Sequence, residues 1–509
     1  MTTPTLVEHW ATQQPDRFAV ISDELSLTWA ELNTWADQAA HRLAAHDIGL
    51  GDIVALRLQT TPHWVVMMLA ISKLQARLLG VNWRLVADEV NFVLENSRAK
   101  LLVLDDDEKP ELVQGITTLG AHRLVRLSAI CEPDAIQASL SEVPRRTMPE
   151  LCAQVIYTSG TTGRPKGVEL LAKPQPGNQR LNTYLADLGG AHRQYGLDDV
   201  ILVSMPMHHG SGPGQVKNAI KNGATLVMQK RFDAANWFDL VERHGVTHWT
   251  GVPTMYKRLK AHHDATGRRA PALKTLGIGA APVPMAIKHW VREQFGDVLH
   301  EGYGSSETGM ITTMSPADHF RKSGSSGKPY AGVLIEIRDD GGQPCAVNEV
   351  GEIWVNTPVC ITHYLNAPPL GDDTRDARGY FRTGDMGRMD DEGYLFITDR
   401  AKDMIISGGV NIYPAEIESA FYQHPQVLDI AVIGLPDEEF GEQVIAYYES
   451  KGGQPIADDE LAAIGQSQLA SYKRPRQFIH VHELPRNAVG KILKRELRQP
   501  HWDHQERNV

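Results

Sequence analysis

Residues 154–168 read QVIYTSGTTGRPKGV, an apolar run followed at once by a loop rich in glycines and hydroxyls. The glycines let backbone N–H groups approach phosphate oxygens, the hydroxyls donate hydrogen bonds, and Lys166 adds a positive charge. This composition predicts a polyphosphate site, with ATP as the obvious ligand. The residues expected to bind the phosphates are Thr158, Ser159, Gly160, Thr161, Thr162, Gly163 and Lys166.

The spacing of this loop differs from that of the Walker loop, in which Gly is followed by four residues and then by Gly-Lys-Ser/Thr. Here Gly167 and Val168 follow the lysine, so an ordinary kinase or GTPase is disfavoured. A plain surface loop explains the composition equally well, because Ser, Thr and Gly cluster in the loops of many proteins. Further motifs are needed to decide between the two interpretations.

The composition indicates a globular enzyme. The 509 residues are enough for several domain-sized units, and the 42% of apolar residues are enough to bury large cores. The formal net charge of -11 provides no cationic field for nucleic acid or an anionic membrane, so neither partner is expected. The longest apolar run, residues 64–71, is far shorter than the roughly 20 residues of a membrane span. We expect it to form a buried helix.

Two further features concern the cellular compartment. The N-terminus has no basic segment followed by an apolar one, so we expect no secretory signal and a cytoplasmic protein. The four cysteines lack short paired spacings, so neither a zinc site nor a disulfide framework is expected.

Strand-like and helical patterns alternate along the chain, which predicts α/β layers. Residues 154–157, 201–204 and 273–278 have the composition of strands. Residues 284–295 have a helical pattern, because Ile287, Trp290, Val291 and Phe295 would share one buried stripe. Near residue 399 a short charged stretch precedes about a hundred residues with their own pattern, which indicates a domain boundary. There Pro414 suits the first turn of a helix with Ile417, Ala420 and Phe421 on its inner face, followed by a strand over 430–434.

Several motifs accompany the glycine-rich loop in a fixed order. They are GYGSSET (302–308), YFRTGD (380–385), DRAKD (399–403), SGGVNIYPAEIE (407–418) and GKIL (490–493). Together with the loop they resemble the signatures of the adenylate-forming superfamily of acyl-CoA synthetases, luciferases and peptide-synthetase adenylation domains. The resemblance extends from LTWAEL (27–32) to KREL (494–497). The form of residues 407–418 is that of CoA ligases.

The resemblance implies an α/β fold with a large N-terminal multi-sheet α/β domain and a small, mobile C-terminal α+β lid. Residues 1–398 would form the N-terminal domain, which binds ATP and the acyl group. Residues 399–403 would form the hinge, with Lys402 as its pivot, and residues 404–509 would form the lid. It also implies a ligase that uses ATP and Mg²⁺ to convert a carboxylic acid to acyl-AMP and then transfers the acyl group to coenzyme A. A small-molecule acid and CoA are thus the expected partners, and the sequence leaves open whether the chain forms a homodimer.

The resemblance also implies roles for residues around the nucleotide. Glu307 is expected to bind magnesium and act in catalysis, since a hard cation prefers carboxylate oxygen; Ser306 keeps the hydroxyl of the usual threonine. Tyr303 would stack on adenine, with core packing as the plainer alternative. Asp385 would accept hydrogen bonds from the ribose, and Arg400 would support ribose or phosphate. The plainer alternatives are that Asp385 is a turn aspartate and that Arg400 forms a surface ion pair. The remaining nucleotide-pocket residues are Gly304 and the small-residue segment Gly279, Ala280, Ala281 and Pro282.

Three further assignments concern catalysis and the thiol. Lys491 matches the lysine that bridges the substrate carboxylate and the α-phosphate in the first step. Ser407, Gly408 and Gly409 resemble the lid face that lines the pantetheine tunnel in the second step. His209 would lie between acyl pocket and tunnel; a metal-binding pair with His208 is disfavoured, since adjacent histidines on a strand point to opposite faces.

The chain also departs from the family pattern. Leu171-Ala172 stands where relatives have a hydroxyl and a histidine, Gln75 replaces a small residue, and Gly80 replaces a proline. These changes either reshape the acyl pocket or weaken adenylation. The leading hypothesis is therefore an acyl- or aryl-CoA ligase. The alternatives are a specialist that only forms thioesters from acyl-AMP and a non-catalytic nucleotide-binding relative; the sequence does not name the acid.

Overall fold

The computed structural model describes residues 6–131, 152–158, 165–170, 175–190, 195–271, 273–400, 402–407, 410–437, 440–487 and 490–502. The chain divides into two compact units. The first unit comprises Met1–Gly251, Arg268–Leu276 and Val359–Leu370, and the second comprises Val252–Gly267, Gly277–Pro358 and Gly371–Val509.

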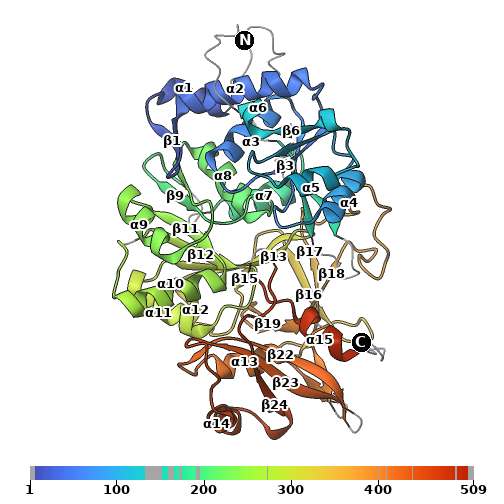
Figure 1. The fold of residues 1–509 in the computed structure, drawn as a ribbon. Coiled ribbons are helices and arrows are strands. Elements are labelled where there is room, and N and C mark those ends of the chain that lie inside the picture. The colour runs from blue at the N-terminus through green and yellow to red at the C-terminus, as the bar shows by residue number, and fades with distance from the viewer. Residues whose placement is uncertain are drawn as a thin grey trace. The chain divides into compact units, whose positions relative to one another are not determined.

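The first unit contains a six-stranded sheet in which five neighbouring strands are parallel and the last pair is antiparallel. The strands, in spatial order, are β6 (Leu124–Arg126), β5 (Leu101–Leu104), β3 (Ile53–Arg57), β4 (Arg77–Gly80), β7 (Gln154–Thr158) and β8 (Lys166–Leu170). Every residue of β3 and β5 is buried, as expected for parallel strands that are covered on both faces. The predicted buried helix over 64–71 is confirmed as part of α3 (Pro62–Lys73), and Figure 1 shows it beside β3.

Five further strands of the first unit are neighbours in the spatial order β11-β9-β10-β1-β2 within a larger sheet, and among these five the β1–β2 pair is antiparallel. The five strands are β1 (Phe18–Ile21), β2 (Ser26–Thr28), β9 (Val200–Val203), β10 (Thr225–Met228) and β11 (His248–Gly251). The helix after β2 begins with a capping box, because the Thr28 side chain accepts from the N–H of Glu31 and the Glu31 carboxylate accepts from that of Thr28. This helix is α2 (Trp29–Ala45). The other α-helices described in this unit, besides α3, are α1 (Leu6–Gln13), α4 (Ala87–Ser97), α5 (Pro110–Gly115), α6 (Leu127–Cys131), α7 (Gln179–Leu188), α8 (Ser211–Asn222) and α9 (Ala234–His244).

The second unit contains strands that carry several of the predicted nucleotide-binding residues. β12 (Thr275–Gly279), β13 (Leu299–Ser305), β14 (Gly309–Met314) and β15 (Lys328–Pro329) are neighbours in that order, and an antiparallel sheet follows. That sheet comprises β16 (Leu334–Arg338), β17 (Gly351–Asn356), β18 (Phe381–Met389) and β19 (Leu395–Arg400). The helices of this part are α10 (Pro253–Thr266), α11 (Met285–Phe295) and α12 (Asp318–Arg321).

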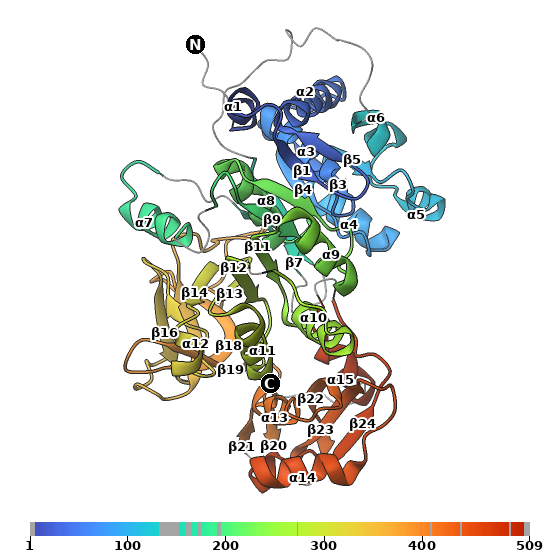
Figure 2. The same ribbon diagram turned by 90° about the vertical axis from the view of Figure 1, so that its left-hand side faces the viewer.

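The C-terminal part of the second unit is a sheet with helices on both faces. Its elements are β20 (Ile405–Ser407), β21 (Val410–Ile412), α13 (Pro414–Phe421), β22 (Val427–Asp437), β23 (Gly441–Ser450), α14 (Asp458–Gln468), β24 (Gln477–His480) and α15 (Lys494–Trp502). Ile430 and Val432 face the core formed with α13 and α14, whereas Ala431 and Ile433 face the core that includes Leu497 of α15. Figure 2 shows α14 beside the ends of these strands. Because successive side chains of β22 point to opposite faces of the sheet, this strand contributes to two separate small cores.

The predicted elements are confirmed with small differences at their ends. The helix expected over 284–295 is α11, and Ile287, Trp290 and Val291 are buried, but Phe295 is only half-buried because the helix ends there. The helix at Pro414 is confirmed with Ile417, Ala420 and Phe421 buried.

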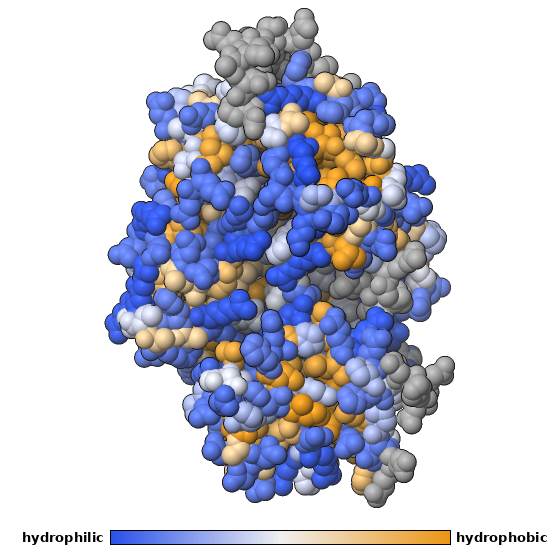
Figure 3. Space-filling view, in the orientation of Figure 1, coloured by the Kyte–Doolittle hydropathy of each residue, from blue (hydrophilic) through white to orange (hydrophobic). Residues whose placement is uncertain are grey.

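In the ranges that the structure describes, no helix is both long and apolar enough to cross a membrane. The face drawn in Figure 3 is covered mainly by hydrophilic residues, with apolar residues gathered in smaller patches.

Candidate functional site

The predicted phosphate loop connects two paired strands of the first unit. β7 ends at Thr158, β8 begins at Lys166, and these two residues are partners in the antiparallel register. The Nζ atom of Lys166 lies 4.8 Å from the centre of the Tyr364 ring, a cation–π contact. Thr158 and Lys166 therefore lie side by side at the same end of this strand pair. Ser159, Gly160, Thr161, Thr162, Gly163 and the Leu171-Ala172 departure lie outside the described residues.

His208 and His209 lie in the turn between β9 and α8. The expectation that they occupy a strand and point to opposite faces is wrong, because β9 already ends at Val203. The two ring centres are 4.7 Å apart. Burial lowers the pKa of His209 to about 4, and burial together with the neighbouring His209 lowers the pKa of His208 well below its ordinary value. Both imidazoles are therefore neutral at pH 7.

Gly80, at the end of β4, lies directly against this turn. A Cβ atom at this position would be 2.6 Å from the Cα of His208, a distance that real Cβ contacts do not reach. The turn can approach β4 only because residue 80 has no side chain. Glycine in place of the family's proline at position 80 therefore allows the backbone of the His208 turn to pack closely against β4.

Replacing Gly80 by alanine is expected to destabilise the fold by about 1–3 kcal/mol, because the added Cβ forces the backbone of His208 to move. The measurement is the apparent melting temperature. The control is Gly49→Ala, since a Cβ atom at Gly49 meets nothing within 4 Å. Equal melting temperatures for the two variants would contradict the expectation.

In the second unit, glycines bring the backbones of β12, β13 and β14 close together. A Cβ atom at Gly279 would lie 2.5 Å from the carbonyl oxygen of Gly302, and one at Gly304 would lie 2.3 Å from that of Gly309. Ala280 then turns the chain with a φ of 66°, in the left-handed region. The small residues predicted for the adenine pocket are therefore required locally by the strand packing, while Ala281 is half-buried and Pro282 exposed after the turn.

Ser306 and Glu307 lie in the turn between β13 and β14, and both are half-buried. The turn is braced on either side of them by hydroxyls: the Oγ of Ser305 and the Oγ1 of Thr308 are 2.9 Å apart, and the Thr308 N–H donates to Ser305 Oγ at 3.2 Å. The carbonyl of the fully buried Thr308 also accepts from the Thr357 hydroxyl at 2.5 Å. The backbone that carries Glu307 is thus held at both ends.

Tyr303 and Asp385, predicted for adenine and ribose, are in direct contact. The Tyr303 hydroxyl donates to Oδ2 of Asp385 at 2.6 Å. Asp385 follows Gly384, which has a φ of 73° in the left-handed region that glycine adopts easily. The N–H of Asp385 donates to the Thr383 hydroxyl at 3.1 Å. Asp385 is also the register partner of Arg400 in the β18–β19 pair. Three residues from separate motifs therefore come together at one place in this unit.

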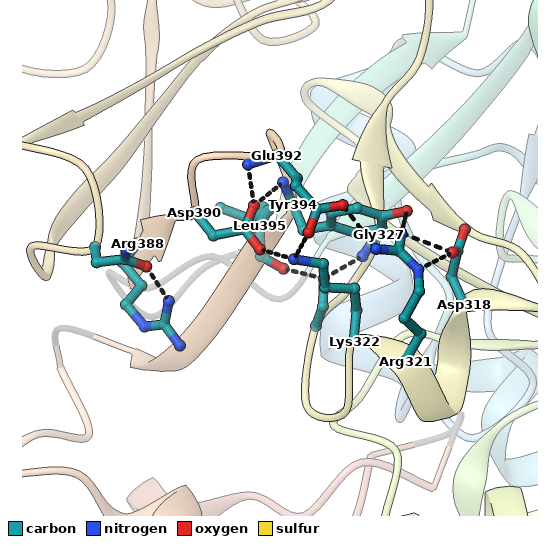
Figure 4. A network of polar contacts seen from close by, with 11 residues as sticks. Asp318, Arg321, Lys322, Gly327, Arg388, Asp390, Glu392, Tyr394 and Leu395 are labelled. Atoms are coloured by element: carbon teal, nitrogen blue, oxygen red, sulfur yellow. Dashed lines mark hydrogen bonds and ion pairs between the residues drawn. The ribbon is translucent and has the colours of Figure 1, made fainter.

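The strand that leads to the predicted hinge is anchored by a network of charges. Lys322 pairs with Asp390 at 2.7 Å and with Glu392 at 2.5 Å, and Arg321 pairs with Glu392 at 2.6 Å (Figure 4). Asp390 and Glu392 belong to the turn between β18 and β19. The cations come from the end of α12, so the entry of β19 is attached to a second element.

Beyond β19, Lys402 lies in an exposed turn. Its carbonyl oxygen accepts from the Nη1 of Arg498 at 2.9 Å, and the Nη2 of Arg498 pairs with Asp403 at 2.6 Å. α15 thus contacts the predicted hinge on its lid side. Ser407 ends β20, where it is paired with Val410, while Gly408 and Gly409 lie outside the described residues.

Lys491 lies in a tight turn before α15. Gly490 has a φ of 80° and its N–H donates to the carbonyl of Asn487 at 2.9 Å. The Asn487 side chain accepts from the Lys491 N–H, and the Asn487 N–H donates to the Lys491 carbonyl, both at 2.9 Å. Next to the turn, Ile492 packs against the core of Ala431 and Ile433. The backbone of Lys491 is therefore tied to the sheet of the C-terminal part.

Two residues of this region have roles that the sequence analysis did not assign. Asn487 closes the Lys491 turn, and Arg498 holds the segment at Lys402. The signal for Asn487 was present, since it lies four residues before Lys491 and asparagine side chains commonly bind nearby backbone groups in turns. No local pattern pointed to Arg498, because its partners are distant in sequence.

Two family models match the chain. The AMP-binding enzyme model matches residues 7–365, and the model of the AMP-binding enzyme C-terminal domain matches residues 416–491.

Relatives and solved structures agree with these matches. The 2-succinylbenzoate–CoA ligase of Bacillus subtilis is 33% identical over 487 residues, which cover 95% of each chain. The long-chain-fatty-acid–CoA ligase of Mycobacterium tuberculosis is 32% identical over 493 residues and 94% of each chain. The structure of o-succinylbenzoate CoA synthetase from Bacillus subtilis with its acyl-adenylate intermediate has a TM-score of 0.80 and 30% identity, covering 100% of this chain and 99% of that one. The predicted fold, with a large multi-sheet α/β part and a smaller C-terminal part, is confirmed by this likeness.

Proposed function

The chain belongs to the family of AMP-binding enzymes and is an acyl- or aryl-CoA ligase that forms acyl-AMP from ATP, and we propose how its residues divide the two half-reactions. The observation that carries the proposal is the contact between Tyr303 and Asp385 with Arg400 as register partner. These residues come from three motifs, and their assembly supports one nucleoside-binding site.

In the first half-reaction a carboxylate oxygen of the acid attacks the α-phosphorus of ATP. A new oxygen–phosphorus bond forms, the bond to the β-phosphate oxygen breaks, and pyrophosphate leaves. Negative charge builds at phosphorus, and a fixed cation stabilises it more in the transition state than in the ground state. We assign this role to Lys491, whose backbone is held by the turn at Asn487. Lys166 and the hydroxyls of residues 158–162 would hold the departing phosphates.

The turn at Glu307 suits the magnesium ion that ATP carries. The carboxylate and the Ser306 hydroxyl supply oxygen, the donor that Mg²⁺ prefers, on a backbone braced by Ser305 and Thr308. When bound, the ion neutralises charge on the polyphosphate. Glu307 would hold it, and Asp385 and Tyr303 would orient the nucleoside independently of it.

In the second half-reaction the sulfur of CoA attacks the acyl carbon, AMP leaves, and the thiol proton passes to solvent or a base. A neutral His209 can accept a hydrogen bond or a proton, and burial keeps it in that form at pH 7. Ser407 with Gly408 and Gly409 would line the pantetheine arm. We propose residues 1–398 as the ATP- and acyl-binding domain, 404–509 as the lid and 399–403 as the hinge, with Lys402 as pivot.

The identity of the acid is a separate question. The relatives are named for an aromatic keto acid and for long-chain fatty acids, so family membership alone does not select one. We place the enzyme in the cytoplasm, because ATP and CoA are its substrates.

The test is pyrophosphate exchange by the wild-type protein across a panel of aromatic, short-chain and long-chain carboxylic acids. We expect exchange with at least one acid, and acyl-CoA formation with the same acid. Exchange would exclude a specialist limited to thioester formation and would show that the Leu171-Ala172 departure leaves adenylation intact. No exchange with any acid, together with efficient capture of supplied acyl-AMP by CoA, would contradict the proposal.

A further inference from the structure

A buried carboxylate in the C-terminal part, Asp429, binds two cations from different elements. Its Oδ1 accepts from the Nζ of Lys257 at 2.8 Å, and its Oδ2 pairs with the Nη1 of Arg486 at 2.9 Å. The Tyr422 hydroxyl also donates to it. The Asp429 side chain is only 4% exposed, and those of Lys257 and Arg486 are 14% and 13% exposed. The contacts are therefore shielded from solvent.

Arg486 connects this carboxylate to the turn that carries Lys491. Its Nη1 donates to the carbonyl of Gly490 at 3.3 Å, and its Nη2 pairs with Glu449 at 2.8 Å. Arg486 is also bridged through its backbone to Ile492 on the far side of the turn. The position of Asp429 and the position of the Lys491 turn are consequently coupled through one guanidinium.

Lys257 approaches from another part of the second unit, the helix α10. At the start of that helix, Thr254 lies against the same turn, because a Cβ atom at Gly490 would be 2.6 Å from Thr254 Oγ1. Residues three apart on a helix share a face, so Thr254 and Lys257 are neighbours on it. α10 therefore contacts the C-terminal part at the Lys491 turn and, one helical turn further on, at Asp429.

Charge balance makes the Lys257 contact significant. Lys257 and Arg486 together neutralise Asp429 and Glu449, whereas Arg486 alone would leave one negative charge in excess. Burial raises the pKa of Asp429, but Lys257 and Arg486 outweigh burial and the pKa lies below its ordinary value. The Nζ of Lys257 also lies 4.0 Å from the centre of the Tyr422 ring. The two contacts of Lys257, with Asp429 and with the Tyr422 ring, are lost if α10 and the C-terminal part separate.

We propose that Lys257 is a positioning residue for the adenylation step: by binding Asp429 it holds the turn of Lys491 against α10. The inference rests on the proposed role of Lys491. Lys257 touches neither substrate in this mechanism, and it acts through Arg486 and the turn. Thioester formation, which does not use Lys491, should not need the contact.

The test variant is Lys257→Met, which keeps an unbranched apolar stem of nearly the same length and leaves Asp429 paired with Arg486. We expect pyrophosphate release to fall about tenfold, while thioester formation from supplied acyl-AMP and CoA is unchanged. Lys257→Arg should restore most of the loss. The matched control is Lys260→Met on the same helix, where the lysine pairs with the partly exposed Asp264. In a Lys491→Ala background, Lys257→Met should cause no further loss of pyrophosphate release.

Hydrogen exchange of the protein alone gives a readout that does not depend on activity. Lys257→Met should lower the protection of the Gly490 and Lys491 amides, and Lys260→Met should not. Equal loss of both half-reactions, additive loss in the Lys491→Ala background, or unchanged amide protection would overturn the inference. If the wild type released no pyrophosphate with any acid but protection fell as expected, the contact would stand and the role of Lys491 would fail instead.

Discussion

Replacing Lys491 by alanine is expected to lower pyrophosphate release at least about 100-fold, because a preorganised charge at the reacting phosphate is lost. Thioester formation from synthetic acyl-AMP and CoA should keep most of its rate, since that step begins with a neutral acyl carbon and an AMP leaving group already in place. The two half-reactions are measured separately, with pyrophosphate release for the first and CoA capture for the second.

The control for this prediction is Lys451→Ala, an exposed lysine after β23 that lies outside the predicted site. It should behave as the wild type in both assays. Equal losses of both half-reactions in Lys491→Ala would contradict the proposed division of roles, because they would indicate a general defect of the C-terminal part.

Replacing Asp385 by alanine is expected to raise the KM for ATP at least about 100-fold, since hydrogen bonds to a charged group contribute about 1.5–3 kcal/mol each and a carboxylate can accept from both ribose hydroxyls. Tyr303→Phe keeps the ring but removes the hydroxyl that donates to Asp385, so it should raise the KM only a few-fold. Steady-state kinetics of pyrophosphate release with varied ATP measure both effects.

Asp391→Ala provides the matched control, because Asp391 is exposed in the turn between β18 and β19. If Asp385→Ala left the KM for ATP unchanged and lowered only the melting temperature, Asp385 would be a structural turn residue and the ribose assignment would be wrong.

The family and the α/β fold were readable from the sequence, and both are confirmed. The reason is local: a strand needs an apolar run, and a helix such as α13 needs a periodic stripe with a suitable first residue such as Pro414. Where the local signal was misleading, tertiary contacts explain it. The histidine pair at 208–209 was assigned to a strand, yet β9 ends earlier and the turn packs against Gly80.

The site could be predicted only in part. The motif residues Tyr303 and Asp385 were identified singly, but their hydrogen bond depends on how two sheets of the second unit meet. The assignments of Glu307, Lys491 and Lys402 remain predictions, to which the structure adds the turns that hold their backbones.

Sequence alone determined the family and its chemistry, because the glycine-rich loop is followed by further motifs in a fixed order over nearly the whole chain. Only the tertiary structure decided which charges control one another. Lys257, Asp429, Glu449 and Arg486 lie on different elements, and none of them is distinctive in its own segment. They meet because β22 and β23 pair in one register and α10 lies against the turn of Lys491, and burial then makes each contact depend on the others.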